Sequence, residues 1–293
     1  MKQQKLQEIY PTSSIHAFPT VDTDYLSIAV AHGFLWIPQK NLSPTEKKLL
    51  QAIAITNPAT IPTAGKERPW YAALFSDTSA PADEGAFRLI QIKCHALEKN
   101  DLAALHEEMS TILPHTVDLF FLSESYGIIV ESFSEDALTT EELEGLFLAL
   151  DSDFNSYTRL FSGAFHSFEA NFTQLLFEEE QLFLYLLEHD TQTKSFDMGT
   201  AIIPFFAIHD VTKSYLMRTL FAEWFDAELE QIICTLWQTQ GNISSAAKEL
   251  FMHRNTLQYK VDKFQQRSNT NLKKMDDLFL CYLLVLSCEL LAT

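Results

Sequence analysis

The hydrophobic and polar positions between residues 81 and 190 form alternating blocks of strand and helix periodicity. Apolar runs of strand length alternate with segments in which apolar residues recur every three or four positions, as on one face of a helix. We expect strands at 87–94, 117–122, 128–133 and 158–166, and helices at 101–113, 141–154 and 168–188. The order β-α-β-β-α-β-α predicts a ferredoxin-like middle domain with a split βαβ arrangement.

Residues 1–80 carry a weaker pattern, which we assign to a small N-terminal α+β region. Residues 25–37 are an apolar run, and residues 70–75 are a candidate strand of the domain that follows. The segment 78–85 combines small, acidic and proline residues, which predicts a loop at the domain boundary.

One helix start is clear in this N-terminal region. Ser43 and Glu46 have the spacing of a capping box, and Pro44 stands at the first helical position. This combination predicts a helix that continues through Ile55.

The last third of the chain has helical periodicity only. Residues 191–225 predict a helical linker. The next helix, 226–240, carries an apolar stripe and ends at Gly241. The stripe consists of Leu229, Ile232, Ile233 and Leu236, and three more helices are expected at 243–250, 253–264 and from 277 onward. We therefore expect an all-α domain at 226–293 and an α+β protein overall.

Residues 241–264, GNISSAAKELFMHRNTLQYKVDKF, have the pattern of a helix-turn-helix. Asn242 and His253 can cap the two helices, and the small Ala246 and Ala247 permit a close helix crossing. The buried side of the second helix is predicted to carry Leu257, Val261 and Phe264. Its opposite side presents hydrogen-bonding and cationic side chains, the types that contact base edges and phosphates when a recognition helix enters the major groove.

The distribution of charge supports a nucleic-acid partner for this segment. The 293-residue chain has a formal net charge of −18, which by itself disfavours phosphate contacts. Between Gly241 and Met275, however, seven basic and two acidic residues give +5, so the remainder carries −23. A basic island in an acidic protein is typical of a single electrostatic footprint on DNA.

The same residues resemble the C-terminal helix-turn-helix of the PucR/CdaR-type transcription regulators. The family pattern N-x-S-x-x-A-x-x-L-x-x-H-R-N-T-L-x-Y-R agrees in register from Asn242 to Lys260. The resemblance implies that Arg254, Asn255, Thr256 and Tyr259 are central to recognition. Lys260 stands where members of the family usually have Arg, and Gln258 stands where many members have Arg. At Gln258, an amide contact to adenine can replace a guanine or phosphate contact.

The residues and the resemblance together define the predicted DNA-contacting set. It consists of Ser244, Ser245, His253, Arg254, Asn255, Thr256, Gln258, Tyr259, Lys260 and Lys263. The resemblance also implies double-stranded operator DNA as partner and a homodimer or higher assembly, because two heads about 34 Å apart would contact a palindrome. By element order, the middle domain is similar to the degenerate GGDEF-like domain that such regulators place before the helix-turn-helix, and the upstream domains would sense a signal.

Two other function classes remain open from the sequence. One is a regulatory protein-interaction module with a vestigial DNA head. Three alternatives for single elements also stay open: His253 as a helix cap and not a base-contacting residue, Tyr259 packed on Lys263, and the last helix as core or as a dimer interface.

The other is a nucleotide-handling enzyme centred on the middle domain. The hairpin 123–127 lacks the paired glycines that let phosphates approach the backbone, and Glu124 is the one acid at its tip. We interpret the run Glu178, Glu179 and Glu180 as a solvated helix face and not as a metal site.

No catalytic or metal-binding spacing occurs among the histidines, serines and cysteines, so we expect no enzyme activity, cofactor or metal. The four cysteines are expected to be buried thiols. The start of the chain lacks a signal core, and the longest apolar run, 278–291, is shorter than the roughly 20 residues that span a bilayer. These features predict a cytoplasmic protein.

Overall fold

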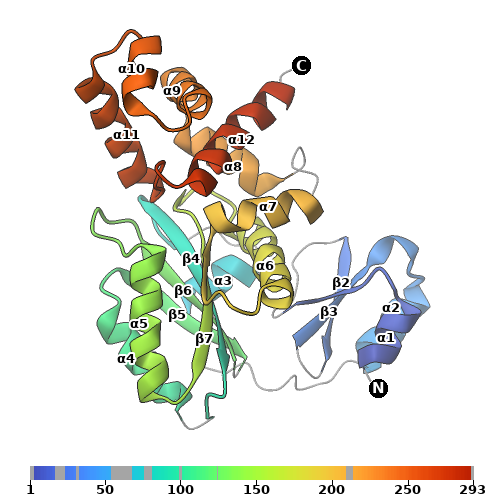
Figure 1. Ribbon diagram of the computed structural model, residues 1–293. Coiled ribbons are helices and arrows are strands. Elements are labelled where there is room, and N and C mark those ends of the chain that lie inside the picture. The colour runs from blue at the N-terminus through green and yellow to red at the C-terminus, as the bar shows by residue number, and fades with distance from the viewer. Residues whose placement is uncertain are drawn as a thin grey trace.

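The computed structural model describes residues 3–16, 24–30, 33–53, 68–75, 81–98, 101–123, 125–208 and 214–291. Figure 1 shows a small N-terminal sheet with two helices, a central sheet with helices on both faces, and a group of C-terminal helices. The expected α+β class is confirmed, with strands in the first two parts and helices alone at the C-terminal end.

The central sheet has the strand order of a ferredoxin-like domain. Its main strands are β4 (Ala86–His95), β5 (Thr116–Ser123), β6 (Tyr126–Ser132) and β7 (Tyr157–Ser162). They lie in the order β5-β6-β4-β7 and every neighbouring pair is antiparallel, as the predicted split βαβ arrangement requires. Two short strands add to it: β8 (His166–Ser167) pairs with β4, and β9 (Ser195–Asp197) runs parallel to β7.

Helices cover both faces of this sheet because its strands bury alternate residues on opposite sides. Ile90 and Ile92 face α4 (Leu102–Ile112) and α5 (Thr140–Asp153), whereas Leu89 faces α6 (Phe172–His189). The predicted helices and strands of this domain are thus present, with shifts of a few residues at their ends. The hairpin at 123–127 is also present, and Glu124 at its tip lies outside the described residues.

The candidate strand at 70–75 is wrong. Residues Pro69–Phe75 form helix α3, which packs against α6 and against side chains of β4 and β5. The buried side chains are Trp70, Tyr71, Ala73 and Leu74. Their spacing of one, three and four positions is that of a helix face, which a run of large apolar residues alone does not distinguish from a strand.

The N-terminal part is a three-stranded antiparallel sheet with two helices. Its elements are α1 (Gln3–Ile9), β1 (Ser14–His16), β2 (Tyr25–Val30), β3 (Gly33–Pro38), a 3-10 turn (Gln39–Asn41) and α2 (Pro44–Ile53). The sheet order is β1-β3-β2, so the apolar run forms a hairpin. The capping box is confirmed, since the Ser43 and Glu46 side chains accept from each other's backbone N–H groups. Residues 54–67 and 76–80, which include the predicted helix end and part of the boundary loop, lie outside the described residues.

The three consecutive glutamates of α6 are not a solvated helix face, which corrects the sequence interpretation. Glu178 accepts hydrogen bonds from the backbone N–H groups of Tyr215 (2.8 Å) and Leu216 (3.3 Å). Glu179 and Glu180 are 1% and 0% exposed. The sequence interpretation fails because neighbouring parts of the protein pack on several sides of α6.

Each buried glutamate has a distinct environment. Burial raises the pKa of Glu179, which lies against Gly163, to about 8. Glu180 pairs with His16 of the N-terminal sheet at 2.7 Å, and His16 stacks on Trp36 with ring centroids 3.8 Å apart. The glutamate run therefore connects helix α6 to the N-terminal sheet through Glu180 and to residues 215–216 through Glu178. Among the described residues, no group of three or more His, Cys, Asp or Glu is placed to hold a metal ion.

The segment 191–225 is more than a linker. It contains β9 and the helices α7 (Met198–Ile208) and α8 (Tyr215–Trp224). Phe196, Ile202 and Leu216 belong to one hydrophobic cluster that runs from the central sheet to the C-terminal helices. The sequence pattern does not predict that this segment adds a strand to the central sheet, because β9 has only three residues and depends on pairing with β7.

The last four helices complete the chain. They are α9 (Ala227–Gln238), α10 (Ile243–Glu249), α11 (Arg254–Ser268) and α12 (Met275–Leu291), close to their predicted positions. Helix α12 packs on α7, α8 and α9, and its Leu280 and Leu284 are completely buried. None of the helices within the described ranges has the length and apolar character needed to cross a membrane.

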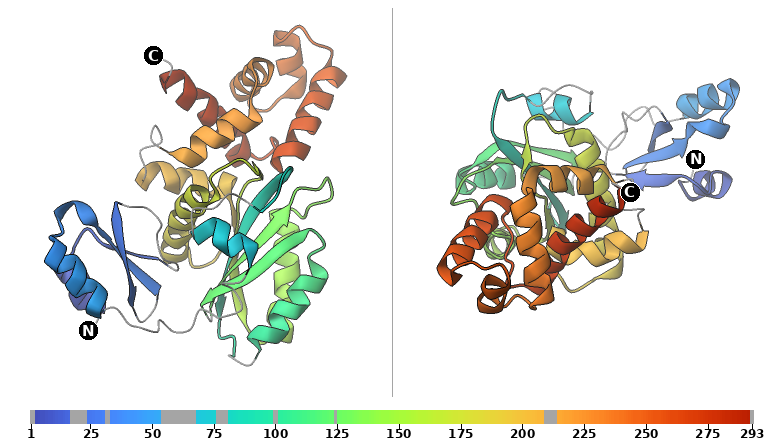
Figure 2. Two further views of the ribbon diagram at one scale, coloured as in Figure 1. Left: turned by 180° about the vertical axis from the view of Figure 1, so that it is seen from behind. Right: turned by 90° about the horizontal axis from the view of Figure 1, so that it is seen from above.

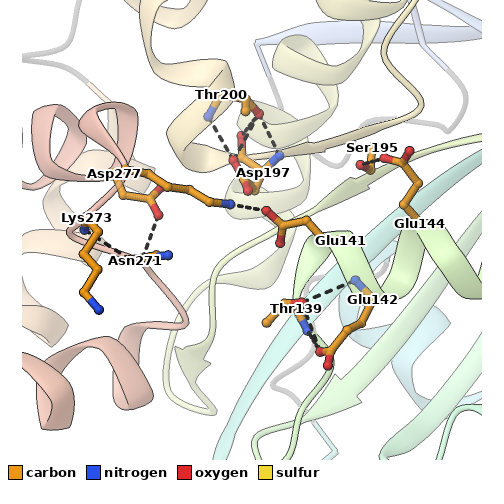
Figure 3. A network of polar contacts seen from close by, with 11 residues as sticks. Thr139, Glu141, Glu142, Glu144, Ser195, Asp197, Thr200, Asn271, Lys273 and Asp277 are labelled. Atoms are coloured by element: carbon orange, nitrogen blue, oxygen red, sulfur yellow. Dashed lines mark hydrogen bonds and ion pairs between the residues drawn. The ribbon is translucent and has the colours of Figure 1, made fainter.

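A polar network joins α12 to the middle domain (Figure 3). Lys274 forms an ion pair with Glu141 at the start of α5. Asp277, 8% exposed, accepts from the Asn271 backbone N–H at 2.6 Å. Its Oδ1 lies so near Gly199 that a Cβ built there would be 2.0 Å away. The junction is therefore closely packed around one carboxyl group.

Replacing Asp277 with Asn is expected to stabilise the protein at alkaline pH. Burial, together with the nearby Asp197, raises the pKa of Asp277 to about 6. A raised carboxyl pKa means that folding favours the protonated form, so stability falls as pH rises from about 4 to about 6 and stays lower above that. Asp277→Asn should raise the free energy of unfolding by about 1 to 3 kcal/mol near pH 8 and change it little near pH 4, measured by urea denaturation. An equal effect at both pH values would contradict this account.

Candidate nucleic-acid interface

Helix α9 begins and ends as the sequence predicts. The Asp226 side chain accepts from the Leu229 backbone N–H at 2.9 Å, and Ile232, Ile233 and Leu236 are buried. At the other end, Gln240 and Gly241 both have positive φ, and the Gly241 N–H donates to the Leu236 carbonyl at 2.7 Å. These are the bonds of a Schellman motif, which stops the helix and turns the chain toward α10.

Helix α10 packs its small residues against α11. The Asn242 side chain caps it by accepting from the Ser245 N–H at 3.0 Å. Ala246 and Ala247 are 0% and 2% exposed, which allows the close crossing expected of the helix pair. Ser244 and Ser245, predicted to contact DNA, are both exposed near the start of α10.

The turn after α10 is a second Schellman motif with an uncommon residue at its left-handed position. Phe251 has φ 52°, and the next N–H, that of Met252, donates to the Ala247 carbonyl at 2.8 Å. Glycine is the usual residue in this conformation. The Phe251 side chain is 98% exposed and so gains no burial in return.

Replacing Phe251 with Gly is expected to stabilise the fold. Relief of the left-handed conformation outweighs the added chain entropy of glycine, so the free energy of unfolding should rise by about 0.5 to 1 kcal/mol. Thermal unfolding at neutral pH measures this, with Phe251→Ala as the matched control that removes the ring and keeps the Cβ. A lower unfolding temperature for the glycine variant would show that the ring has a structural role that its exposure conceals.

Helix α11 has one buried and one exposed side. His253 caps it, because its Nδ1 accepts from the Asn255 backbone N–H at 3.3 Å. Leu257, Val261 and Phe264 are buried, as predicted. The exposed members of the predicted DNA-contacting set on this side are His253, Arg254, Asn255, Thr256, Tyr259 and Lys263. Tyr259 keeps 68% of its surface in solvent.

The two remaining members of the set are half-buried and bonded within the protein. Gln258 Nε2 donates to Asp262 Oδ1 at 2.7 Å, one turn along the same helix. Lys260 Nζ forms an ion pair with Glu228 Oε2 of α9 at 2.7 Å. The sequence does not predict the ion pair between Lys260 and Glu228, because 32 residues separate these two residues.

The position of the helix pair leaves its exposed side accessible. Figure 1 shows α10 and α11 projecting beyond the sheets, and the two views of Figure 2 place them far from the N-terminal part. The predicted set thus lies along the start of α10 and the solvent-facing positions of α11, with Arg254 at the leading end and Lys260 and Lys263 further along the helix. Exposed amides, hydroxyls and cations on a capped helix can donate to base edges and to phosphates.

Comparison with known families agrees with this geometry. Residues 229–286 match the model of the PucR C-terminal helix-turn-helix domain. The chain carries a PucR-type helix-turn-helix domain. The match confirms the resemblance inferred from the HRNTLQYK motif and supports DNA binding and transcription regulation.

Two relatives extend over most of the chain. An uncharacterized protein of Bacillus subtilis (strain 168), YxkF, is 28% identical over 267 residues, which cover 87% of this chain and 88% of that protein. A leucine-rich protein of Streptococcus dysgalactiae subsp. equisimilis is 26% identical over 293 residues, covering 96% and 99%. Among solved structures, a regulator of polyketide synthase expression from Bifidobacterium adolescentis aligns with a TM-score of 0.42 and 11% identity, over 80% of this chain and 95% of that one.

Proposed function

We propose that this protein is a sequence-specific DNA-binding transcription regulator whose helix α11 enters the major groove. The observation that carries the proposal is the two-sided character of α11 within a PucR-type domain. Its apolar side is fixed in a buried core, while Arg254 and Asn255 are exposed at its capped leading end. A rigid helix with free hydrogen-bonding groups at its N-terminus is the form in which helix-turn-helix domains contact bases.

The predicted contacts divide into two kinds. Arg254 and Asn255 have the side chains that bond guanine and adenine in pairs of hydrogen bonds, so they are assigned to base edges. Ser244, Ser245 and Lys263 are assigned to phosphates, which orient the domain without selecting sequence. The acidic remainder of the protein, at −23, repels DNA and limits binding to this surface.

The proposed active form is a homodimer in the cytoplasm. A single helix-turn-helix covers too few base pairs for a unique site, whereas two heads about 34 Å apart contact two half-sites on one side of the duplex. The domain at 81–190 and the segment that follows it are proposed to set this spacing in response to a signal. These parts share one hydrophobic core with the helix-turn-helix helices, so a change in their packing can change the position of those helices.

Genome-wide recovery of DNA fragments bound by the full-length protein tests the proposal. We expect a small set of intergenic fragments with a common inverted repeat. Purified protein should retard such a fragment in a gel at a concentration at least about 1,000-fold below that needed for a coding fragment of equal length. Recovery of fragments in proportion to their abundance, with equal retardation of both probes, would contradict sequence-specific binding.

A further inference from the structure

A groove lined by three basic and two acidic side chains lies beside the recognition helix. It has a volume of about 200 Å³ and runs between the first turn of α9 and the C-terminal half of α11. Lys260, Lys263 and Arg267 line one wall, spaced three and four residues apart on α11, and Asp226, Glu228 and Leu229 line the other. Three cations on one stripe of the recognition helix form a surface suited to anionic oxygen.

One of the two carboxylates that line the groove already pairs with one of its cations. Glu228 Oε2 is 2.7 Å from Lys260 Nζ, and the two side chains are 53% and 31% exposed. Lys263 is exposed at the next turn, and Arg267 donates to the Trp224 carbonyl. Lys260 is thus paired with an anionic oxygen of the protein itself.

We propose that this groove binds a phosphate of the DNA backbone and that Glu228 competes with that phosphate for Lys260. The proposal rests on the proposed function, since it assigns the backbone contact of the same helix. When the leading end of α11 is in the major groove, its flank faces the sugar-phosphate backbone. Phosphate then displaces Glu228, which turns toward solvent.

The competition is energetically feasible because the ion pair is exposed. An exposed carboxylate-ammonium pair changes an equilibrium by no more than about five-fold, so a DNA phosphate can replace it at small cost. The pair nevertheless weakens every DNA complex that uses Lys260, specific or not. Base contacts by Arg254 and Asn255 add affinity only at the correct site, so Glu228 lowers the affinity for all DNA and leaves discrimination between sequences to those base contacts.

A double-mutant cycle tests the competition. The variants are Glu228→Gln, Lys260→Gln and their combination in the full-length protein, and the probe is a short fluorescent duplex of mixed sequence at low salt, since phosphate contacts do not depend on sequence. We expect Glu228→Gln to tighten binding about two- to five-fold and to have no such effect in the Lys260→Gln background.

Glu230→Gln is the matched control. Glu230 lies in the same turn of α9 and carries the same charge, and none of the ion pairs found within the described residues includes it. Equal effects of Glu228→Gln and Glu230→Gln, or an unchanged Glu228→Gln effect in the Lys260→Gln background, would overturn the site. A parent protein that binds neither this duplex nor any genomic fragment overturns the proposed function as well, whereas binding without coupling overturns only the site.

Discussion

Replacing Arg254 and Asn255 with Ala together is expected to reduce affinity for the protein's own genomic site about 100-fold or more. Both side chains are exposed at the leading end of α11, where a recognition helix meets base edges. A base contact made by two hydrogen bonds contributes about 1 to 3 kcal/mol of discrimination, so the loss of two such contacts has an effect of this size. Fluorescence anisotropy with the recovered site and with a mixed-sequence duplex measures it.

The expected pattern is loss of affinity for the specific site with a smaller loss for the mixed-sequence duplex. Arg218→Ala serves as the control, because Arg218 is an exposed arginine on α8, outside the predicted set. It should leave the affinity for the site unchanged. If the double variant binds the site with the affinity and salt dependence of the parent, α11 is not the recognition helix.

The helix-turn-helix is predictable from the sequence because its determinants are local. The caps at Asn242 and His253 and the apolar positions Leu257 and Val261 all act within one or two helical turns. The same holds for the ferredoxin-like domain, in which strand and helix periods are separated by turn residues. Its strand order then follows from the small number of ways to pair four such strands.

The buried charges and pairings that the sequence does not predict depend on distant partners, whereas helix α3 is missed because a short apolar run does not distinguish a helix from a strand. Glu179 and Glu180 lie in a charged run that is typical of a solvated surface, and only packing against Gly163, just after β7, and against the N-terminal sheet makes them buried. The contact between Lys260 and Glu228 and the short strand β9 likewise need residues far along the chain. Charge and periodicity describe one segment at a time, so they give the exposed side of α11 but not which of its cations are already paired.

Arg88 is another buried charge of this kind, and replacing it with Met is expected to lower the free energy of unfolding by about 3 to 5 kcal/mol. Arg88 is 0% exposed in β4, in a run of residues that otherwise predicts an apolar strand. Its guanidinium donates to Glu131 Oε2 at 2.5 Å, to the Leu138 carbonyl at 2.7 Å and to Ser162 Oγ at 3.2 Å. Arg88→Met removes these bonds and leaves Glu131, 2% exposed, as an uncompensated buried carboxylate.

Urea denaturation measures this loss, and a second variant identifies its cause. Combining Arg88→Met with Glu131→Leu removes both charges, so it should recover most of the lost stability, because the main cost of the single variant is the unpaired carboxylate. Arg218→Met, at an exposed position of α8, should change the free energy of unfolding by less than about 0.5 kcal/mol. If the paired variant is no more stable than Arg88→Met alone, the stability is lost through the three hydrogen bonds to the guanidinium and not through the unpaired carboxylate.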